Sequence, residues 1–240
     1  MCIRDRVTEA VAKDTLVLPL NDKRALDIAI SDFAHDIAAI IIEPIPANNG
    51  LMLQDKSFLE YLRKVTAENN ILLIFDEVIS GFRVGFEGAS GYYNIQPDII
   101  TYGKIIGGGM PVGAYGARKE LMSHIAPEGN VYQAGTLSGN PVAMSAGIAQ
   151  LRECLKPGFY ESLAQKTSVF TSQLNTYSKS KGYLFKVFSI GSIFWIAFTE
   201  KEKISSAEDI STESMKYFRI FHAELLERGL YLGPSGYEVG

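Results

Sequence analysis

Charged side chains follow three predicted strands of this 240-residue chain, close to the points where the strands end. Glu43 follows the apolar run IAAIII, Asp76 follows ILLIF, and Lys104 comes shortly after DIIT. Because ligands of open α/β sheets bind outside the carboxyl ends of the strands, we expect these three side chains at one rim of a sheet. The alternative is a structural ion pair between Asp76 and Lys104, which costs much in desolvation and stabilises only weakly.

Three consecutive glycines follow Lys104 in the stretch GKIIGGGMP. They match neither GxGxxG nor GxxxxGK[ST], because Asp98 stands where a P-loop requires glycine, so a nucleotide phosphate loop is excluded. Glycines beside a lysine allow the backbone to approach a bound group closely. A desolvated lysine loses its proton readily and can form a Schiff base with a carbonyl. Pyridoxal 5′-phosphate needs such a lysine, and an acid such as Asp76 at its ring nitrogen.

The composition excludes several classes of function. The chain is 47% apolar and 21% charged, and its formal net charge of −4 gives no concentrated basic face for nucleic acid. Its longest apolar runs are far below the roughly 20 residues of a membrane span. Cys2 and Cys154 have no metal or redox spacing, which favours a reduced, cytoplasmic setting, and the three histidines are scattered. We therefore expect no nucleic-acid, membrane or metal-binding role.

Both ends of the sequence suggest a fragment. Residues 1–6, MCIRDR, have no apolar segment of the secretory type and resemble a non-native leader. The last residues, YLGPSGYEVG, follow an apolar strand-like segment without a helix cap or a polar tail.

Helix patterns and apolar strands alternate in the first part of the chain. ALDIAISDF has helical spacing, and Ser57 with Glu60 predicts a capping box that opens a helix to about residue 69. Strands are expected at 37–42, 71–75, 99–101 and 112–115. Because the first two are apolar throughout rather than alternating, they favour a parallel sheet covered by helices on both faces.

The pattern changes near residue 150. A helix of small residues is expected over 140–154 and a long polar helix follows to about 180. YLFKVFSIGSIFWIAF alternates like an antiparallel strand pair, and a helix is expected over 212–227. We therefore expect a large domain over residues 1–152 and a smaller, incomplete domain over 153–240.

Three stretches carry a resemblance to a known family: LLIFDEVISGFRVG, PDIITYGKIIGGGMPVGAYGAR and VYQAGTLSGNPVAMSAG. They resemble class III aminotransferases of pyridoxal phosphate fold type I. The resemblance implies an α/β fold, with a mostly parallel sheet between helices in the large domain and part of a smaller α+β domain. Family chains are much longer, so the resemblance also implies that an N-terminal part is missing and that this polypeptide alone is impaired.

The resemblance implies roles for four residues near the predicted sheet rim. Lys104 would hold pyridoxal 5′-phosphate covalently, and Asp76 would pair with its ring nitrogen. Val78 would pack flat on the cofactor ring, although plain core packing also explains a valine there. Ser80 stands beside the ring oxygen, where many class III enzymes have glutamine.

Four further positions are candidates for the phosphate and substrate sites. Gly135 and Thr136 match the segment that reaches the cofactor phosphate of the neighbouring subunit, which implies a homodimer with shared sites. The alternative for this segment is a helix N-terminal signal, since Ser138 and Asn140 precede Pro141. Glu238 stands where several aminotransferases use an arginine to hold a second carboxylate, although such an acid is more often a solvated surface residue. Glu43 is a further substrate-site candidate.

The closest similarity within the family is to its aminomutase branch. That branch moves an amino group within glutamate-1-semialdehyde to give 5-aminolevulinate for tetrapyrrole synthesis, and it uses the pyridoxamine 5′-phosphate form of the cofactor. One alternative is a class III ω-aminotransferase with a keto-acid acceptor. The other is a non-catalytic paralogue of the same fold, against which the retained Asp76 and Lys104 argue.

Overall fold

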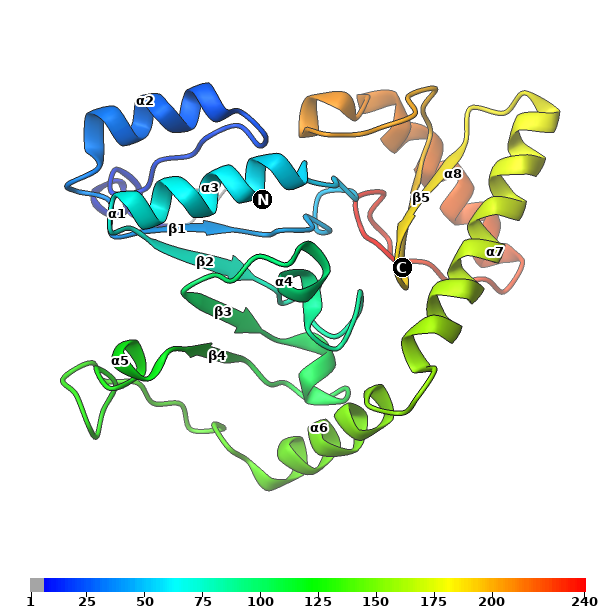
Figure 1. Ribbon diagram of the computed structural model, residues 1–240. Helices are drawn as coiled ribbons and strands as arrows, with labels where there is room; N and C mark the ends of the chain where they lie inside the picture. Colours follow the sequence, from blue (N-terminus) through cyan, green and yellow to red (C-terminus); the bar gives the residue numbers. More distant parts are fainter. Residues whose placement is uncertain (1–6) are drawn as a thin grey trace.

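The computed structural model describes residues 7–240, so the predicted leader, residues 1–6, lies outside the described residues together with Cys2 (Figure 1). The strands are β1 (Ala39–Ile42), β2 (Leu72–Asp76), β3 (Ile99–Tyr102), β4 (Ala114–Ala117), β5 (Lys186–Ile190) and β6 (Ile193–Ala197). The helices are α1 (Glu9–Ala12), α2 (Lys23–Phe33), α3 (Lys56–Glu68), α4 (Gly88–Tyr93), α5 (Lys119–Met122), α6 (Pro141–Cys154), α7 (Phe159–Lys181) and α8 (Thr212–Glu227), and the short 3₁₀ helices are η1 (Lys104–Gly107) and η2 (Ala207–Asp209).

The first four strands form one sheet in the order β1-β2-β3-β4. β1, β2 and β3 are parallel, as the apolar runs predict, whereas β4 runs antiparallel to β3. The fourth strand also lies two residues later than the predicted 112–115. A parallel return needs a crossover of a dozen or more residues, usually a helix, and the segment between β3 and β4 is shorter and holds only η1. The chain therefore reverses and adds β4 as an antiparallel edge.

The predicted helices are present, with one correction at a helix start. α3 begins at Lys56 with Asp55 as its N-cap residue, so the predicted capping box of Ser57 and Glu60 is wrong. Ser57 lies inside the first turn, where its hydroxyl is not at the capping position. The helices α6, α7 and α8 agree with the expected ranges to within a few residues.

The C-terminal half contains the expected antiparallel pair. β5 and β6 pair with Val187 opposite Ile196. The last residue of the chain, Gly240, exchanges two backbone hydrogen bonds with Phe194, and the indole N–H of Trp195 donates to the carbonyl of Gly236 at 2.8 Å. The C-terminal segment is thereby held against β6.

One apolar core joins the two sheets. It includes Leu59 and Phe75 from the first part of the chain and Ile193 and Trp195 from β6, each no more than 1% exposed. The division into domains at residue 152, close to the end of α6, stays a prediction. Among the described residues no helix has the length and apolarity that crossing a bilayer requires.

Candidate active site

The predicted rim is formed where β1, β2 and β3 end. Asp76 is the last residue of β2 and lies opposite Thr101 of β3. Its Oδ1 accepts hydrogen bonds from the backbone N–H of Val78 at 3.1 Å and from the hydroxyl of Thr101 at 3.2 Å. Its Oδ2 accepts no hydrogen bond from residues 7–240. One carboxylate oxygen is thus fixed in place while the other remains available to a bound donor.

Lys104 begins η1 and is separated from β3 by Gly103 alone. Its φ angle of 47° lies in the left-handed region, which a non-glycine residue adopts at a cost of about 1–3 kcal/mol and which is common at functional sites. Its side chain is exposed and, within residues 7–240, makes no hydrogen bond or ion pair. The structural ion pair with Asp76 considered as an alternative is therefore not formed. The amine is free to react or bind.

Glu43 follows β1 and shares the electrostatic environment of the other two groups. Burial raises the pKa of its carboxyl group most, and the charge of Asp76 adds to the rise. A backbone hydrogen bond from Ala47, at 3.4 Å, and the charge of Lys104 act in the opposite direction. The structure therefore brings Glu43, Asp76 and Lys104 together, as the strand ends predict.

The glycines after Lys104 have a packing role that the sequence did not indicate. Gly108 has a φ of 56°, and a Cβ there would clash with the backbone carbonyl of Ala146 in α6. From the other side, a Cβ on Gly147 would clash with the carbonyl of Ile106. The close backbone approach expected from these glycines is therefore an approach to α6 and not to a bound group. The effect is to fix η1, and with it Lys104, on a rigid helix.

Val78 packs beside Gly103. Its Cγ1 would lie 3.2 Å from a Cβ on Gly103, the residue before Lys104. Ser80 is 1% exposed, and its hydroxyl donates to Oε2 of Glu77 at 3.1 Å. The role of Ser80 beside a cofactor ring stays a prediction. The proton of its hydroxyl group is already donated to Glu77.

Glu77 is the site residue that the sequence reasoning missed. It is fully buried and accepts the backbone N–H groups of Ala89, at 2.6 Å, and Ser90, at 2.9 Å, at the start of α4. Burial raises the pKa of this carboxyl group, and the three hydrogen bonds oppose the rise. Gly88, with φ 63°, has no room for a Cβ beside the carboxylate. Glu77 therefore holds the loop after β2 to the start of α4. In the sequence, the signal for this role was the presence of a second acid directly after Asp76.

Gly135 and Thr136 lie in an exposed segment between α5 and α6. Within the described residues neither makes a hydrogen bond to Asp76 or Lys104. The helix signal in this segment is confirmed, since α6 begins at Pro141 and Asn140 accepts from the N–H groups of its first turn at 3.0 and 3.1 Å. The phosphate role of the segment stays a prediction.

Glu238 is exposed in the C-terminal segment. Its carboxylate packs over Gly233 and makes no ion pair within residues 7–240. No contact joins it to Glu43, Asp76 or Lys104, so its substrate-site role also stays a prediction.

The rim fits pyridoxal phosphate by the chemistry of its groups. The cofactor needs an amine for its aldehyde, a carboxylate for its ring nitrogen and an apolar surface for its ring. Lys104 offers an unpaired amine and Asp76 an unpaired carboxylate oxygen, and Val78, which lies beside Gly103, offers an apolar surface.

One protein family and several known proteins are similar to this chain in sequence. The family model described as aminotransferase class-III matches residues 5–239. A glutamate-1-semialdehyde 2,1-aminomutase from Francisella tularensis subsp. tularensis strain SCHU S4 is 44% identical over 235 residues, which cover 98% of this chain and 54% of the relative. The chain thus spans about half the length of the curated relatives it matches.

Two solved structures share the fold. An omega-transaminase from Sphaerobacter thermophilus superposes with a TM-score of 0.91 at 31% identity, covering 99% of this chain and 54% of that one. A glutamate-1-semialdehyde aminomutase variant from Pseudomonas aeruginosa PAO1, in complex with PMP, gives a TM-score of 0.79 at 25% identity, covering 92% of this chain and 50% of that one. The predicted fold class, pyridoxal phosphate fold type I, is confirmed by these neighbours.

Proposed function

This chain belongs to the class III aminotransferases, and from that premise we propose that it carries the catalytic centre of a pyridoxal phosphate-dependent enzyme. The observation that carries the proposal is the rim itself. An unpaired lysine amine and a carboxylate with one free oxygen lie beyond neighbouring strands, and nothing in residues 7–240 neutralises either one.

Each rim residue has a distinct task in this proposal. Lys104 would hold the cofactor through its aldehyde and, once displaced by substrate, would move protons at the substrate carbon. Asp76 would accept the ring N–H on its free Oδ2 and so keep that nitrogen protonated. When bound, pyridoxal phosphate supplies an electron sink for the amino group that is transferred. Val78 would keep water from one face of the ring, and the hydrogen bonds of Glu77 would hold the loop that carries Val78.

The specific reaction we propose is conversion of glutamate-1-semialdehyde to 5-aminolevulinate, in the service of porphyrin synthesis. The Francisella relative supports it by its name and its 44% identity. Glu238, in place of an arginine for a second carboxylate, also favours a reaction that needs no dicarboxylate acceptor. Glu43, whose carboxyl pKa is raised by burial, would offer a carboxyl group to the substrate end of the site. The rival is an ω-aminotransferase, which the similarity to the Sphaerobacter transaminase supports.

The proposed assembly is a homodimer. Gly135 and Thr136 are exposed and make no hydrogen bond to Asp76 or Lys104 of their own chain within residues 7–240, which is the arrangement expected if they contact the cofactor phosphate of a second subunit. We therefore expect a cytoplasmic homodimer with shared sites, in which residues up to about 152 bind the cofactor and residues 153–240 form the smaller domain.

A chimera tests the reaction. Residues 5–239 of this chain replace the matched region of the Francisella aminomutase, so that activity depends on Lys104 and Asp76 of this chain. Formation of 5-aminolevulinate without any added keto acid is the expected result, and a Lys104→Ala chimera is the control. Amino transfer only when a keto acid is added would contradict the aminomutase proposal. A folded chimera that binds the cofactor and does neither would support the non-catalytic paralogue.

A further inference from the structure

The chain that follows β2 carries Val78, and we define the β2 loop as residues 77–84. The loop turns tightly, since the N–H of Gly81 donates to the carbonyl of Glu77 at 2.9 Å. Phe82 has a φ of 59°, in the left-handed region, where the backbone of an aromatic residue is strained. Strain of this kind persists only where the surrounding contacts hold it, so the contacts of the β2 loop decide its conformation.

The β2 loop packs against the end of β3, which leads to Lys104. The ring of Phe82 packs against the ring of Tyr102, with centroids 5.2 Å apart. The side chain of Val78 lies beside Gly103, whose Cβ, if present, would be 3.2 Å from the Cγ1 of the valine. Tyr102 and Gly103 are the two residues before Lys104. The conformation of the β2 loop therefore bears on the position of Lys104 as well as on that of Val78.

Two side-chain hydroxyl groups from the second half of the chain bind consecutive carbonyl groups of the β2 loop. The hydroxyl of Tyr160, in the first turn of α7, donates to the carbonyl of Phe82 at 3.3 Å. The hydroxyl of Ser192, in the turn between β5 and β6, donates to the carbonyl of Arg83 at 3.0 Å. The two bonds thus hold the peptide groups directly after the strained residue.

These two hydrogen bonds have the strength needed to select the conformation of the β2 loop. Backbone strain at one residue and two net hydrogen bonds are of the same order in free energy. With both hydroxyl groups present, the strained conformation of Phe82 is held; without them, its backbone can relax to a negative φ. That relaxation would move the phenyl ring away from Tyr102 and so change the support of Lys104.

We propose that Tyr160 and Ser192 are positioning residues, which act through the β2 loop to hold Val78 and Lys104 in place for pyridoxal phosphate. The inference rests on the proposed function, because it concerns the residues that would hold the cofactor. It gives the second half of the chain a role at a site whose predicted cofactor-binding residues all precede α6. The hydrogen-bonded partners are 78 and 109 residues apart in the sequence, so no local pattern predicts these contacts.

Amide hydrogen exchange tests the first step, that the hydroxyl groups hold the β2 loop. The amides of Gly81 and Arg83, which are bonded within the loop, are followed in the 240-residue protein. Each of Tyr160→Phe and Ser192→Ala should speed their exchange by about 3- to 10-fold, the factor that one net hydrogen bond supplies. The amide of Phe75, in β2, is the internal control and should not change. Unchanged exchange of the loop amides in both variants would overturn the proposal.

Labelling of lysines tests the second step, that the β2 loop positions Lys104. The 240-residue protein is treated with pyridoxal phosphate and borohydride, and the label on Lys104 is divided by the label on Lys64, an exposed lysine of α3. In the double variant Tyr160→Phe/Ser192→Ala this ratio should fall by about 3-fold or more, because both bonds that hold the strained loop are lost. An unchanged ratio in the double variant would contradict the positioning role alone. A parent protein without any preference for Lys104 would overturn the proposed function and this inference together, so the two failures are distinct.

Two matched variants test whether the hydroxyl groups themselves are responsible. Ser192→Thr keeps a hydroxyl group and should retain the labelling ratio of the parent, whereas Ser192→Ala should not. Tyr177→Phe removes the hydroxyl group of another tyrosine in α7, which makes no hydrogen bond within the described residues. It should leave both the loop exchange and the labelling ratio unchanged. Equal effects of Tyr177→Phe and Tyr160→Phe would overturn the assignment of Tyr160.

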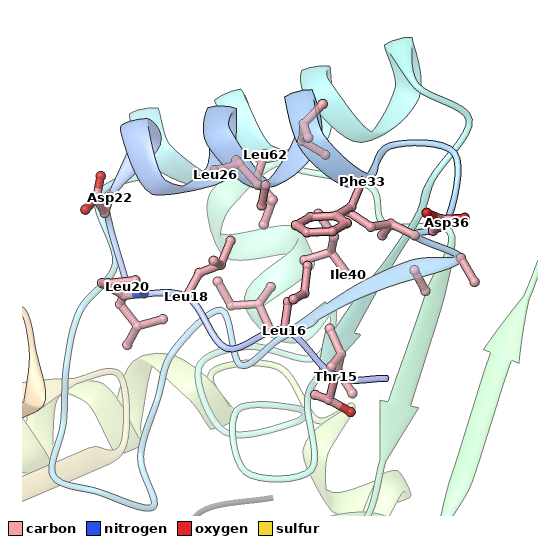
Figure 2. A pocket seen from close by; sticks show the side chains of 18 of the residues that line it. Thr15, Leu16, Leu18, Leu20, Asp22, Leu26, Phe33, Asp36, Ile40 and Leu62 are labelled. Carbon is pink, nitrogen blue, oxygen red and sulfur yellow. The ribbon is translucent and has the colours of Figure 1, made fainter. Parts of the chain in front are cut away.

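A cavity that the β2 loop does not line provides a control for general loss of stability. Figure 2 shows this cavity, of about 730 Å³, with Leu16 and Leu18 on one side and Phe33 of α2 on the other. Ile30 also lines it, and Ile30→Val costs about as much stability as the loss of one hydrogen bond. This variant should nevertheless keep the exchange of the β2 loop and the labelling ratio of the parent. A ratio that falls as far in Ile30→Val as in the double variant would assign the effect to stability and refute the positioning role.

Discussion

Replacing Glu77 by glutamine should lower the free energy of unfolding, because the carboxylate accepts three hydrogen bonds and an amide cannot. Oε2 accepts from Ala89 N–H and the Ser80 hydroxyl, and Oε1 accepts from Ser90 N–H. Glutamine has nearly the same size as glutamate, but it has one acceptor oxygen and one NH₂ group in place of the two carboxylate oxygens. In either orientation, its NH₂ therefore faces at least one buried backbone N–H.

The magnitude follows from two opposing effects. Leaving a buried donor unsatisfied costs about 1–3 kcal/mol, and the remaining bonds lose their charge-assisted strength. Removing the charge relieves the desolvation that raises the pKa of Glu77, which offsets part of that loss. The amide of glutamine both loses an acceptor oxygen and places its NH₂ donor against a backbone N–H donor. We therefore expect a net loss of about 1–2 kcal/mol in the free energy of unfolding at neutral pH.

Urea unfolding measures the change, with Glu87→Gln as the matched control. Glu87 lies in the same loop, is exposed and makes no side-chain hydrogen bond within the described residues, so its replacement should stay within about 0.5 kcal/mol. Glu77→Gln should lower the midpoint at an unchanged slope. A midpoint equal to that of Glu87→Gln would refute the assignment of Glu77 as the group that holds this loop.

Three other substitutions test separate parts of the account. Asp76→Asn in the chimera keeps a hydrogen-bonding side chain but loses the charge that holds the ring proton, and should raise the catalytic barrier by about 2–4 kcal/mol; near-normal turnover would contradict that role. Glu43→Gln tests a pH effect, because the pKa of Glu43 in the folded protein lies above its ordinary value of 4.5. The contribution of Glu43 to the free energy of unfolding is therefore complete below pH 4.5 and is lost as the pH rises through the folded pKa. Urea midpoints from pH 4 to 7 should therefore fall less steeply in Glu43→Gln than in the parent, and identical slopes would exclude the effect. Gly147→Ala should lower the free energy of unfolding by about 1–3 kcal/mol, because the added methyl group separates α6 from η1. The control Gly113→Ala, whose methyl group meets no atom within 4 Å, should be nearly neutral in the same urea assay. Equal losses of stability in the two variants would disprove the close approach.

Much of the fold could be predicted because the local signals agree with the tertiary structure. β1 and β2 form a parallel pair, as their apolar runs predict, although Ala39 and Ile41 of β1 are exposed, and α8 has clear periodicity. The direction of β4 could not be predicted from its own residues, because it depends on the short connection that η1 provides. The start of α3 was misplaced because Ser57 is as good a cap by type as Asp55, and only the backbone distinguishes them.

The candidate site was predictable where strand ends determine position. Glu43 and Lys104 follow strands and Asp76 ends one, and parallel strands bring such residues to one edge. The role of Glu77 depends on its contact with Ala89 and Ser90, twelve and thirteen residues later, which no local pattern encodes. The clash that Gly108 and Gly147 avoid is likewise a tertiary contact between η1 and α6, so the glycines were assigned to ligand approach instead.

The most direct test of the central claim is the position at which pyridoxal phosphate attaches. The protein is incubated with the cofactor, the bond is reduced with borohydride, and the labelled peptide is identified by mass spectrometry. Lys104 follows β3, which pairs with the strand that ends in Asp76, and its amine makes no hydrogen bond or ion pair within residues 7–240, so the reduced adduct should lie on Lys104 and disappear in Lys104→Ala. Label spread over exposed lysines such as Lys64, with none enriched at Lys104, would contradict the account.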